Sequence, residues 1–307
     1  MTVTTAPGST PAAPSDALAK LSLFCRDIKI SHSVFAMPWA ILAGVMAWHR
    51  VGGPFAGKLA LIVLCMVTAR TVAMASNRVL DAELDRKNPR TTRRALPSGQ
   101  LSLRFVTAMM VLCAAAFIAA TALFWLVYAN VWPLALSLPV LAFISSYPLL
   151  KRFSRLCHYY LGAALALAPI CAWIAIAGTI ALPPVLMAVA VLCWTAGFDI
   201  IYACQDYESD LETGVVSVPA KSGIARALWI SRLTHVVSLA ALVVLGLLMP
   251  ELSLLYFIGV ALAGALLIIE HAIVKPTDLS KVGLAFFTIN GVISLVVGTL
   301  GVIDVFI

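Results

Sequence analysis

Residues 105–127 read FVTAMMVLCAAAFIAATALFWLV and carry no charged side chain. A helix needs about 20 apolar residues to cross the hydrocarbon core of a bilayer, so this stretch is long enough to span one. Apolar stretches of similar length recur along the chain between short polar breaks. We predict nine spanning helices, at residues 30–48, 59–80, 104–127, 131–149, 158–178, 183–203, 226–248, 253–272 and 282–303. The predicted fold class is all-α, a polytopic membrane bundle of nine transmembrane helices.

The composition agrees with a membrane protein. Of the 307 residues, 62% are hydrophobic and 11% are charged, which excludes a water-soluble globular enzyme and a disordered chain. The seven cysteines lack C-x-x-C metal spacing, so we expect them to be reduced and packed. Residues 1–20 are rich in Ala, Pro, Ser and Thr. We expect a disordered tail there, followed by one nine-helix domain over residues 21–307.

The basic residues predict how the chain is oriented in the membrane. With a cytoplasmic N-terminus, eighteen of the twenty-one Lys and Arg residues fall on the cytoplasmic side, as the positive-inside rule requires. Arg50 and Lys58 fall on the opposite side, and Arg70 falls within the second predicted span, where an ionisable group suggests a function. Because this distribution accounts for the net charge of +7, we expect a lipid bilayer and no nucleic acid as partner.

Eight of the fourteen acidic residues lie in two short windows, where the second and sixth predicted helices emerge on the basic side. Asp81 and Asp85 in the first window, and Asp206 and Asp210 in the second, each read D-x-x-x-D. This spacing stacks two carboxylates on one helix face, where like charges repel. We infer that a cation from outside the chain lies between them. The alternative, a solvated helix end, is the ordinary interpretation of one such motif and is weaker for two.

Helical spacing extends each motif into a stripe of side chains. The first stripe runs through Arg70, Met74, Asn77, Asp81 and Asp85, and the second runs through Asp199, Tyr202, Asp206 and Asp210. Carboxylate and amide oxygens suit Mg²⁺, which is commonly bound by one or two carboxylates together with the phosphates of a substrate. Two facing stripes therefore predict a site where Mg²⁺ and carboxylates hold a diphosphate.

Three strings resemble motifs of the UbiA superfamily of intramembrane prenyltransferases. NRVLDAELD at residues 77–85 resembles the N-R-x-x-D-x-x-x-D signature, and DIIYACQDYESD at residues 199–210 resembles the second aspartate-rich motif. YPLLK at residues 147–151 is similar to the Y-x-x-x-K element. Residues 31–38 and 69–78 are most similar to 4-hydroxybenzoate polyprenyltransferases and to related enzymes of menaquinone biosynthesis by the futalosine route.

The resemblance implies transfer of a polyprenyl group from polyprenyl diphosphate to a ring carbon of an aromatic acid in respiratory quinone biosynthesis. It implies Mg²⁺ as cofactor, held by Asn77, Asp81, Asp85, Asp206 and Asp210. Substrate-binding side chains at the diphosphate would be Arg78, Tyr147, Lys151 and Arg152. For Arg152, anchoring by the positive-inside rule is an equal alternative. The resemblance favours 4-hydroxybenzoate as the acceptor and leaves a dihydroxynaphthoate open.

Two residues of the second stripe are candidates for the catalytic step. Asp199 and Tyr202 would align or deprotonate the hydroxyl of the aromatic acceptor. Asp199 lies deeper than the metal motif, where a bare carboxylate costs about 2.5–3.5 kcal/mol, so a functional contact would explain it. Arg70 either pairs with Asp199 or binds the carboxylate of the aromatic acid, as guanidinium geometry favours.

Histidine offers no candidate ligand in the sequence. The residues His32, His158, His235 and His271 show no carboxylate or histidine partner at ligand spacing, so we expect packing or interfacial roles for them.

An ion-coupled transporter is the alternative from another functional class, because polytopic helices with an intramembrane arginine also mark such carriers. The acidic groups gather beside basic loops and not at the midplane, which favours the diphosphate site. We therefore expect an integral membrane enzyme whose N-terminus and active-site loops are cytoplasmic, in a bacterial plasma (inner) membrane. Its expected partners are polyprenyl diphosphate, an aromatic acid and the bilayer.

Overall fold

The computed structural model describes residues 16–307, without the side chains of Ser31 and His32, so the prediction for His32 lies outside it. Within this range nine helical segments are long and apolar enough to cross a membrane, which confirms the predicted all-α bundle. The main helices are α2 (Met37–Val51), α3 (Ala56–Lys87), α4 (Leu103–Tyr128), α5 (Trp132–Leu150), α6 (Cys157–Ala177), α7 (Leu182–Ala203), α10 (Ile224–Leu248), α11 (Leu254–Ile273) and α13 (Asn290–Val305).

Shorter elements extend three of these spans or connect them. The 3₁₀ helix η1 (Ile30–Phe35) precedes α2, and the 3₁₀ turn η2 (Cys204–Asp206) joins α7 to α8 (Tyr207–Thr213). The last span comprises α12 (Val282–Leu284), the π-helical turn η3 (Ala285–Ile289) and α13. The remaining elements are α1 (Ala17–Asp27) and α9 (Val218–Ser222).

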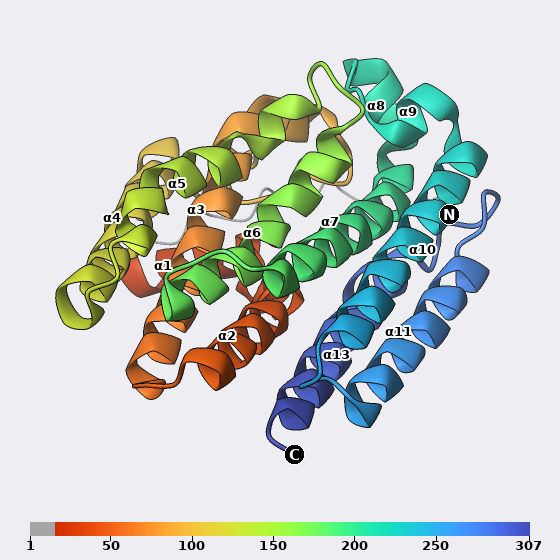
Figure 1. Cartoon of the computed structure of the whole chain (residues 1–307). Coiled ribbons are helices and arrows are strands. Elements are labelled where there is room, and N and C mark those ends of the chain that lie inside the picture. Colours follow the sequence, from red (N-terminus) through yellow and green to blue (C-terminus); the bar gives the residue numbers. More distant parts are fainter. Residues whose placement is uncertain (1–15) are drawn as a thin grey trace, which may run out of the picture.

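The spanning helices form two packed groups of four. Helices α3, α4, α5 and α6 pack on one another, and α7 packs on α10, α10 on α11 and α11 on α13. Helix α2 contacts both α6 and α13, and α6 also packs along α7, so the two groups are joined (Figure 1). The short helices α8 and α9 lie together at one end of the bundle (Figure 1).

The junction between the two groups depends on one close approach of backbone. A Cβ atom added to Gly162 on α6 would lie 2.3 Å from the carbonyl oxygen of Leu192 on α7. Small residues allow this approach in membrane bundles, where packing and not the hydrophobic effect drives helix association. Gly162 therefore brings α6 and α7 together, and with them the side chains at their ends.

Helix α1 falls partly in the segment that the sequence predicts as a tail. Most of residues 1–20 lie outside the described range, and α1 begins at Ala17, where the carboxylate of Asp16 accepts a hydrogen bond from the Ala19 amide. Phe24 of α1 and Ile28, the residue after it, are buried against a cluster that includes Ala75 of α3. This apolar face explains why an ordered helix forms before the first span.

A buried polar network fixes the π-helical turn η3. The indole nitrogen of Trp194 donates to Asn290 Oδ1 at 2.6 Å, and Asn290 Nδ2 donates to Glu270 Oε1 at 2.8 Å and to the Ala285 carbonyl at 2.9 Å. Asn290 and Glu270 are fully enclosed. The turn presents Phe286, whose ring centroid lies 4.3 Å from that of Tyr202.

Candidate active site

A polar cavity of about 280 Å³ is formed by the ends of α3, α6 and α7 together with α8 and the loop that follows α3. Eleven of the twelve residues that the sequence predicts for the site line it: Arg70, Asn77, Arg78, Asp81, Asp85, Tyr147, Lys151, Asp199, Tyr202, Asp206 and Asp210. The exception is Arg152, which is exposed and donates to the carbonyl of Leu80 at 2.5 Å. This contact attaches the segment after α5 to α3, outside the lining of the cavity.

The first aspartate motif lies on a single uninterrupted helix. Helix α3 continues seven residues beyond the predicted span, so Asp81 and Asp85 share one helix face as the spacing predicts. Asp81 is 1% exposed, and its Oδ2 accepts hydrogen bonds from Asn77 at 2.7 Å and from Lys151 Nζ at 2.6 Å. Its Oδ1 is buried and has no hydrogen-bond partner among the described residues.

The second aspartate motif is broken by a change of helix type, so the predicted continuous stripe is wrong. Helix α7 ends at Ala203, η2 covers Cys204–Asp206, and α8 begins at Tyr207. Asp206 accepts from Arg90 through both carboxylate oxygens, at 2.8 and 2.5 Å, and from Asn88 at 2.8 Å. Asp210 accepts from Ser217 Oγ at 2.7 Å. The motif still faces the cavity because partners from other segments hold it.

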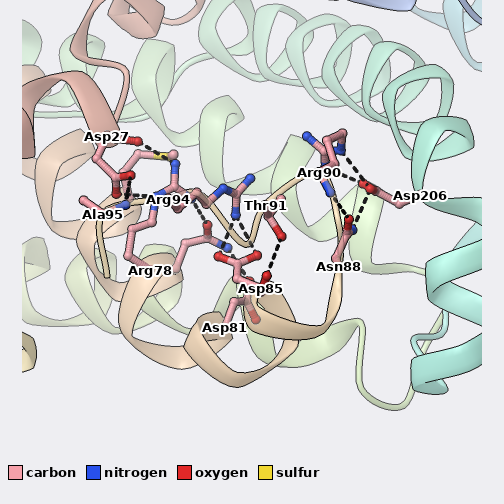
Figure 2. A network of polar contacts seen from close by, with 12 residues as sticks. Asp27, Arg78, Asp81, Asp85, Asn88, Arg90, Thr91, Arg94, Ala95 and Asp206 are labelled. Atoms are coloured by element: carbon pink, nitrogen blue, oxygen red, sulfur yellow. Dashed lines mark hydrogen bonds and ion pairs between the residues drawn. The ribbon is translucent and has the colours of Figure 1, made fainter. Parts of the chain in front are cut away.

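The chain itself supplies cations to both motifs. Besides Lys151 at Asp81 and Arg90 at Asp206, the guanidinium of Arg94 donates to both oxygens of Asp85 at 2.8 and 2.7 Å (Figure 2). Each motif therefore has a counter-charge within the chain, which spacing in the sequence does not predict. Sequence spacing missed it because Arg90 and Arg94 lie on the loop after α3, and only folding brings that loop over the carboxylates.

Basic side chains gather at one wall of the cavity. The guanidinium of Arg78 is 3% exposed and donates to the carboxylate of Asp27 on α1 at 2.9 Å. Lys29, just after α1, also lines the cavity; its burial, and then the nearby charges of Arg94 and Arg78, lower its pKa. Because these positive charges repel one another, an anion bound among them would stabilise the site.

Asp199 and Tyr202 also line this cavity. Asp199 Oδ2 lies 2.7 Å from His158 Nδ1, a contact that the sequence does not predict, whereas the burial of His158 agrees with the expected packing role. The proposed alternative pairing of Asp199 with Arg70 is wrong, because Arg70 donates to the Lys29 carbonyl at 3.3 Å. The hydroxyl of Tyr202 accepts from Arg90 Nη1 at 2.7 Å.

A second cavity, of about 160 Å³ and almost wholly apolar, extends between α3, α4, α5 and α6. Five residues line both cavities: Arg70, Met74, Tyr147, Leu161 and Leu165. The Nε atom of Arg70 is buried and has no hydrogen-bond partner in the described part of the chain. The polar and apolar spaces therefore adjoin at Arg70 and Tyr147.

Comparison with known proteins identifies the family. The model of the UbiA prenyltransferase family matches residues 37–292, which is most of the chain. The chain belongs to the UbiA prenyltransferase family. It is therefore an integral membrane enzyme that transfers prenyl groups.

Individual relatives agree with this assignment. A 4-hydroxybenzoate octaprenyltransferase of Alkalilimnicola ehrlichii is 30% identical over 78% of this chain and 80% of its own length, and one of Francisella tularensis is 28% identical over 87% and 90%. The apo structure of a UbiA homolog from Aeropyrum pernix K1 is 30% identical and superposes with a TM-score of 0.80, covering 90% of this chain and 98% of that one.

A more distant structure shows the same fold. A UbiA homolog from Archaeoglobus fulgidus, solved with GPP and Mg²⁺, is 18% identical and superposes with a TM-score of 0.70 over 93% of this chain and 100% of that one.

The donor set of this UbiA family member fits a hard divalent cation. Five oxygen-bearing side chains that the sequence predicts as ligands line the cavity, and the free Oδ1 of Asp81 lacks a partner. Within residues 16–307, no three His, Cys, Asp or Glu side chains lie close enough to hold one ion by themselves. Such a cavity suits Mg²⁺, which takes few protein ligands and completes its shell with water and phosphate oxygens.

Away from the cavity of this prenyltransferase, His235 is buried, as the sequence predicts, and it contacts His271, which the sequence does not predict. His235 Nδ1 lies 2.9 Å from His271 Nε2, and His235 Nε2 lies 3.1 Å from the Trp194 carbonyl. The two rings sit on α10 and α11, which pack together. Their spacing of 36 residues in sequence gives no signal of this contact.

Proposed function

We propose that this enzyme transfers a polyprenyl group from polyprenyl diphosphate to 4-hydroxybenzoate, in a Mg²⁺-dependent reaction of respiratory quinone biosynthesis. The observation that carries the proposal is the meeting of two cavities. One gathers both aspartate motifs and a cluster of basic side chains, the other is apolar, and they share Arg70 and Tyr147. A molecule with an anionic head and a long hydrocarbon tail matches both spaces.

The diphosphate head occupies the polar cavity between the two aspartate motifs. Asn77, Asp81, Asp85, Asp206 and Asp210 would hold Mg²⁺, which would supply Lewis-acid stabilisation of the departing diphosphate. Lys151, Arg78, Arg90, Arg94 and Lys29 line the same cavity and provide cationic hydrogen-bond donors for phosphate oxygens. Arg90 is hydrogen-bonded to Asp206, and Arg94 is hydrogen-bonded to Asp85. Both arginines exchange these carboxylates for phosphate oxygens when the substrate enters.

The polyprenyl tail lies in the apolar cavity and needs no polar recognition there. Side chains such as Met66, Phe117 and Leu136 line this cavity. Tyr147, at the junction, lies beside the bond that breaks between the tail and the diphosphate. An octaprenyl tail is far larger than about 160 Å³, so most of its length extends beyond this space between the helices into the bilayer.

The aromatic acceptor meets the allylic carbon near Asp199 and Tyr202. Asp199 accepts a hydrogen bond from the phenolic hydroxyl, which raises the electron density of the ring carbon beside it. The allylic C–O bond breaks with its electron pair on the diphosphate, and the ring carbon forms the new C–C bond and then gives its proton to the released diphosphate. The free Nε of Arg70 supports a role in binding the acceptor carboxylate.

The comparisons support this assignment of substrates and metal. The relatives from Alkalilimnicola and Francisella carry the name 4-hydroxybenzoate octaprenyltransferase, and the Archaeoglobus homolog was solved with GPP and Mg²⁺. The distribution of Lys and Arg supports a cytoplasmic N-terminus and cytoplasmic active-site loops. Because these named relatives are bacterial, we place the enzyme in a bacterial inner membrane.

One assay tests the function directly. Purified enzyme is incubated with Mg²⁺ and octaprenyl diphosphate, with either 4-hydroxybenzoate or a dihydroxynaphthoate, and the products are analysed by mass spectrometry. We expect a prenylated 4-hydroxybenzoate that disappears in EDTA and returns when Mg²⁺ is added. If a product forms only with the dihydroxynaphthoate, that compound is the acceptor and the assignment of 4-hydroxybenzoate is wrong. Full activity in excess EDTA would contradict the Mg²⁺ dependence.

A further inference from the structure

His158 and Asp199 form a pair at the wall of the polar cavity. His158 is near the start of α6 and its side chain is 4% exposed, whereas Asp199 is near the end of α7 and is 21% exposed. Both residues line the cavity. The carboxylate can therefore touch a ligand in the cavity, while the imidazole behind it is almost fully enclosed.

Hydrogen bonds on both ring nitrogens define the tautomer of His158. The backbone N–H of Val218, at the start of α9, points to His158 Nε2 at a distance of 3.2 Å. An amide N–H only donates, so Nε2 must be the acceptor and carry no hydrogen. The hydrogen of the neutral ring then lies on Nδ1, which donates to Asp199 Oδ2 at 2.7 Å.

This donation leaves Asp199 with one carboxylate oxygen for a ligand. In residues 16–307 no other hydrogen bond to the Asp199 side chain occurs. His158 holds Oδ2, so rotation of the carboxylate is restricted and Oδ1 is the oxygen available on the cavity side. A carboxylate fixed in this way presents its lone pairs in a defined direction, as preorganised catalytic groups do.

The loop between α8 and α9 makes hydrogen bonds to two parts of the cavity wall. The Val216 amide donates to the Lys151 carbonyl at 2.7 Å, and Ser217 Oγ donates to Asp210 at 2.7 Å. The next residue, Val218, fixes His158. Ser217 therefore supports a residue on the diphosphate side, and its neighbour supports the pair on the acceptor side.

We propose that His158 is a positioning residue for the prenyl acceptor: locked by the Val218 amide, it orients Asp199 so that Oδ1 accepts the hydrogen bond of the acceptor hydroxyl. This inference rests on the proposed function, because it needs an acceptor with a hydroxyl near Asp199. A purely structural His158 would instead serve only to attach α9 to α6.

Steady-state kinetics of four full-length variants test the proposal. His158→Leu removes the donor to Asp199, whereas His158→Asn places an amide Nδ2–H where Nδ1–H was. Ser217→Ala removes the hydrogen bond to Asp210 and the N-cap that Ser217 Oγ provides for α9 at the Ala220 amide, and it keeps the His158 side chain. Ser238→Ala, on α10, removes a buried hydrogen bond to the Ala190 carbonyl of α7 and is the matched control.

Three quantities are measured for each variant: kcat, the KM of each substrate, and hydrolysis of prenyl diphosphate without acceptor. We expect His158→Leu to lower kcat/KM for 4-hydroxybenzoate about 10- to 100-fold, the range for losing one hydrogen bond to a charged group. Its KM for prenyl diphosphate and its acceptor-independent hydrolysis should stay at wild-type values. His158→Asn should recover most of the loss.

Ser217→Ala should show the opposite pattern, with a raised KM for prenyl diphosphate and an unchanged KM for the acceptor. Ser238→Ala should match the wild type. Equal impairment of His158→Asn and His158→Leu, or equal shifts of both KM values in His158→Leu, would overturn the positioning role. A wild-type enzyme that hydrolyses prenyl diphosphate but prenylates no aromatic acid would overturn the proposed function, an outcome that is visible without any variant.

Discussion

The two aspartate motifs have the same spacing but are held in different ways. Asp81 and Asp85 lie on the continuous helix α3, so local backbone geometry alone places their carboxylates on one face. Asp206 and Asp210 lie on either side of the junction between η2 and α8. Their positions depend on contacts with other segments. Equal spacing in sequence therefore does not mean equal rigidity in the folded protein.

The contacts of the second motif come from distant parts of the chain. Asp206 is held by Arg90 and Asn88 from the loop after α3, and Asp210 by Ser217 from the loop before α9. The first motif also has partners outside its helix, Lys151 at Asp81 and Arg94 at Asp85, but Asn77 supports Asp81 from within the same helix. We expect substitutions in the supporting segments to disturb the second motif more than the first.

The largest effect should come from the first motif itself. Asp81→Asn keeps the shape of the side chain but removes the charge and the free Oδ1 that suits a cation. We expect kcat to fall about 100- to 1,000-fold, the range for losing one preorganised electrostatic group. The measurement is turnover across a Mg²⁺ titration, with folding checked by size-exclusion chromatography. Wild-type kcat at saturating Mg²⁺ would contradict the assigned role.

A second substitution tests the support of the wall beside the second motif. Asn290→Ala leaves Trp194, Glu270 and the Ala285 carbonyl without their shared partner. Because these groups are buried, we expect the free energy of unfolding to fall by about 2–4 kcal/mol. Thermal unfolding in detergent measures the change. Ser294 lies in the same helix as Asn290, and Ser294→Ala removes one buried hydrogen bond, to the Phe35 carbonyl of η1. The free energy of unfolding should fall clearly less in this variant.

The loop arginines compare the two motifs directly. Arg90→Ala frees Asp206 and Tyr202, whereas Arg94→Ala frees Asp85, which α3 still positions. We expect kcat/KM for prenyl diphosphate to fall about 10-fold more in Arg90→Ala, about the value of one charge-assisted hydrogen bond. Initial rates at limiting prenyl diphosphate give this ratio. Equal losses in both variants would show that the second motif, at the junction of η2 and α8, depends on the loop no more than the first motif does.

The smallest effect should occur far from either motif. Arg50 forms an ion pair with Glu251 at 2.6 Å and is 36% exposed. Because the guanidinium is partly exposed, and Gln can still donate a hydrogen bond to Glu251, which is 9% exposed, Arg50→Gln should change stability by about the 0–1 kcal/mol of surface pairs and the unfolding midpoint little. Its kinetic constants should equal those of the wild type. A kinetic change would mean that this end of the bundle is coupled to the cavity, which the contacts do not predict.

The sequence predicts the spans well because length and hydropathy determine them, as residues 105–127 illustrate. It also predicts eleven of twelve site residues as neighbours of one cavity, because they cluster at the ends of helices that meet there. Arg152 differs because a basic residue beside a motif can bond to a carbonyl of a neighbouring helix, here Leu80 of α3, as easily as it can face the cavity.

Other parts of the site depend on contacts between distant segments. Nothing in the spacing of His158 and Asp199, forty-one residues apart, predicts their hydrogen bond. The partners Arg90 and Arg94 were missed for the same reason, since a loop has no fixed periodicity from which to place a side chain. Helix α1 was missed because its apolar face is too short to register beside the long membrane spans.

The π-helical turn η3 gives the last span two independent faces. An α-helix advances about 100° per residue, so the additional residue of a π turn rotates the segments on either side of it relative to each other. On one side of the turn, Gly298 meets Pro38 so closely that a Cβ would lie 2.4 Å from the proline ring. Within the turn, Phe286 packs on Tyr202. Deleting one residue from Ala285–Ile289 would rotate the segments on either side of the turn relative to each other. The span could then keep its packing on α2 or its contact with the cavity wall, but not both.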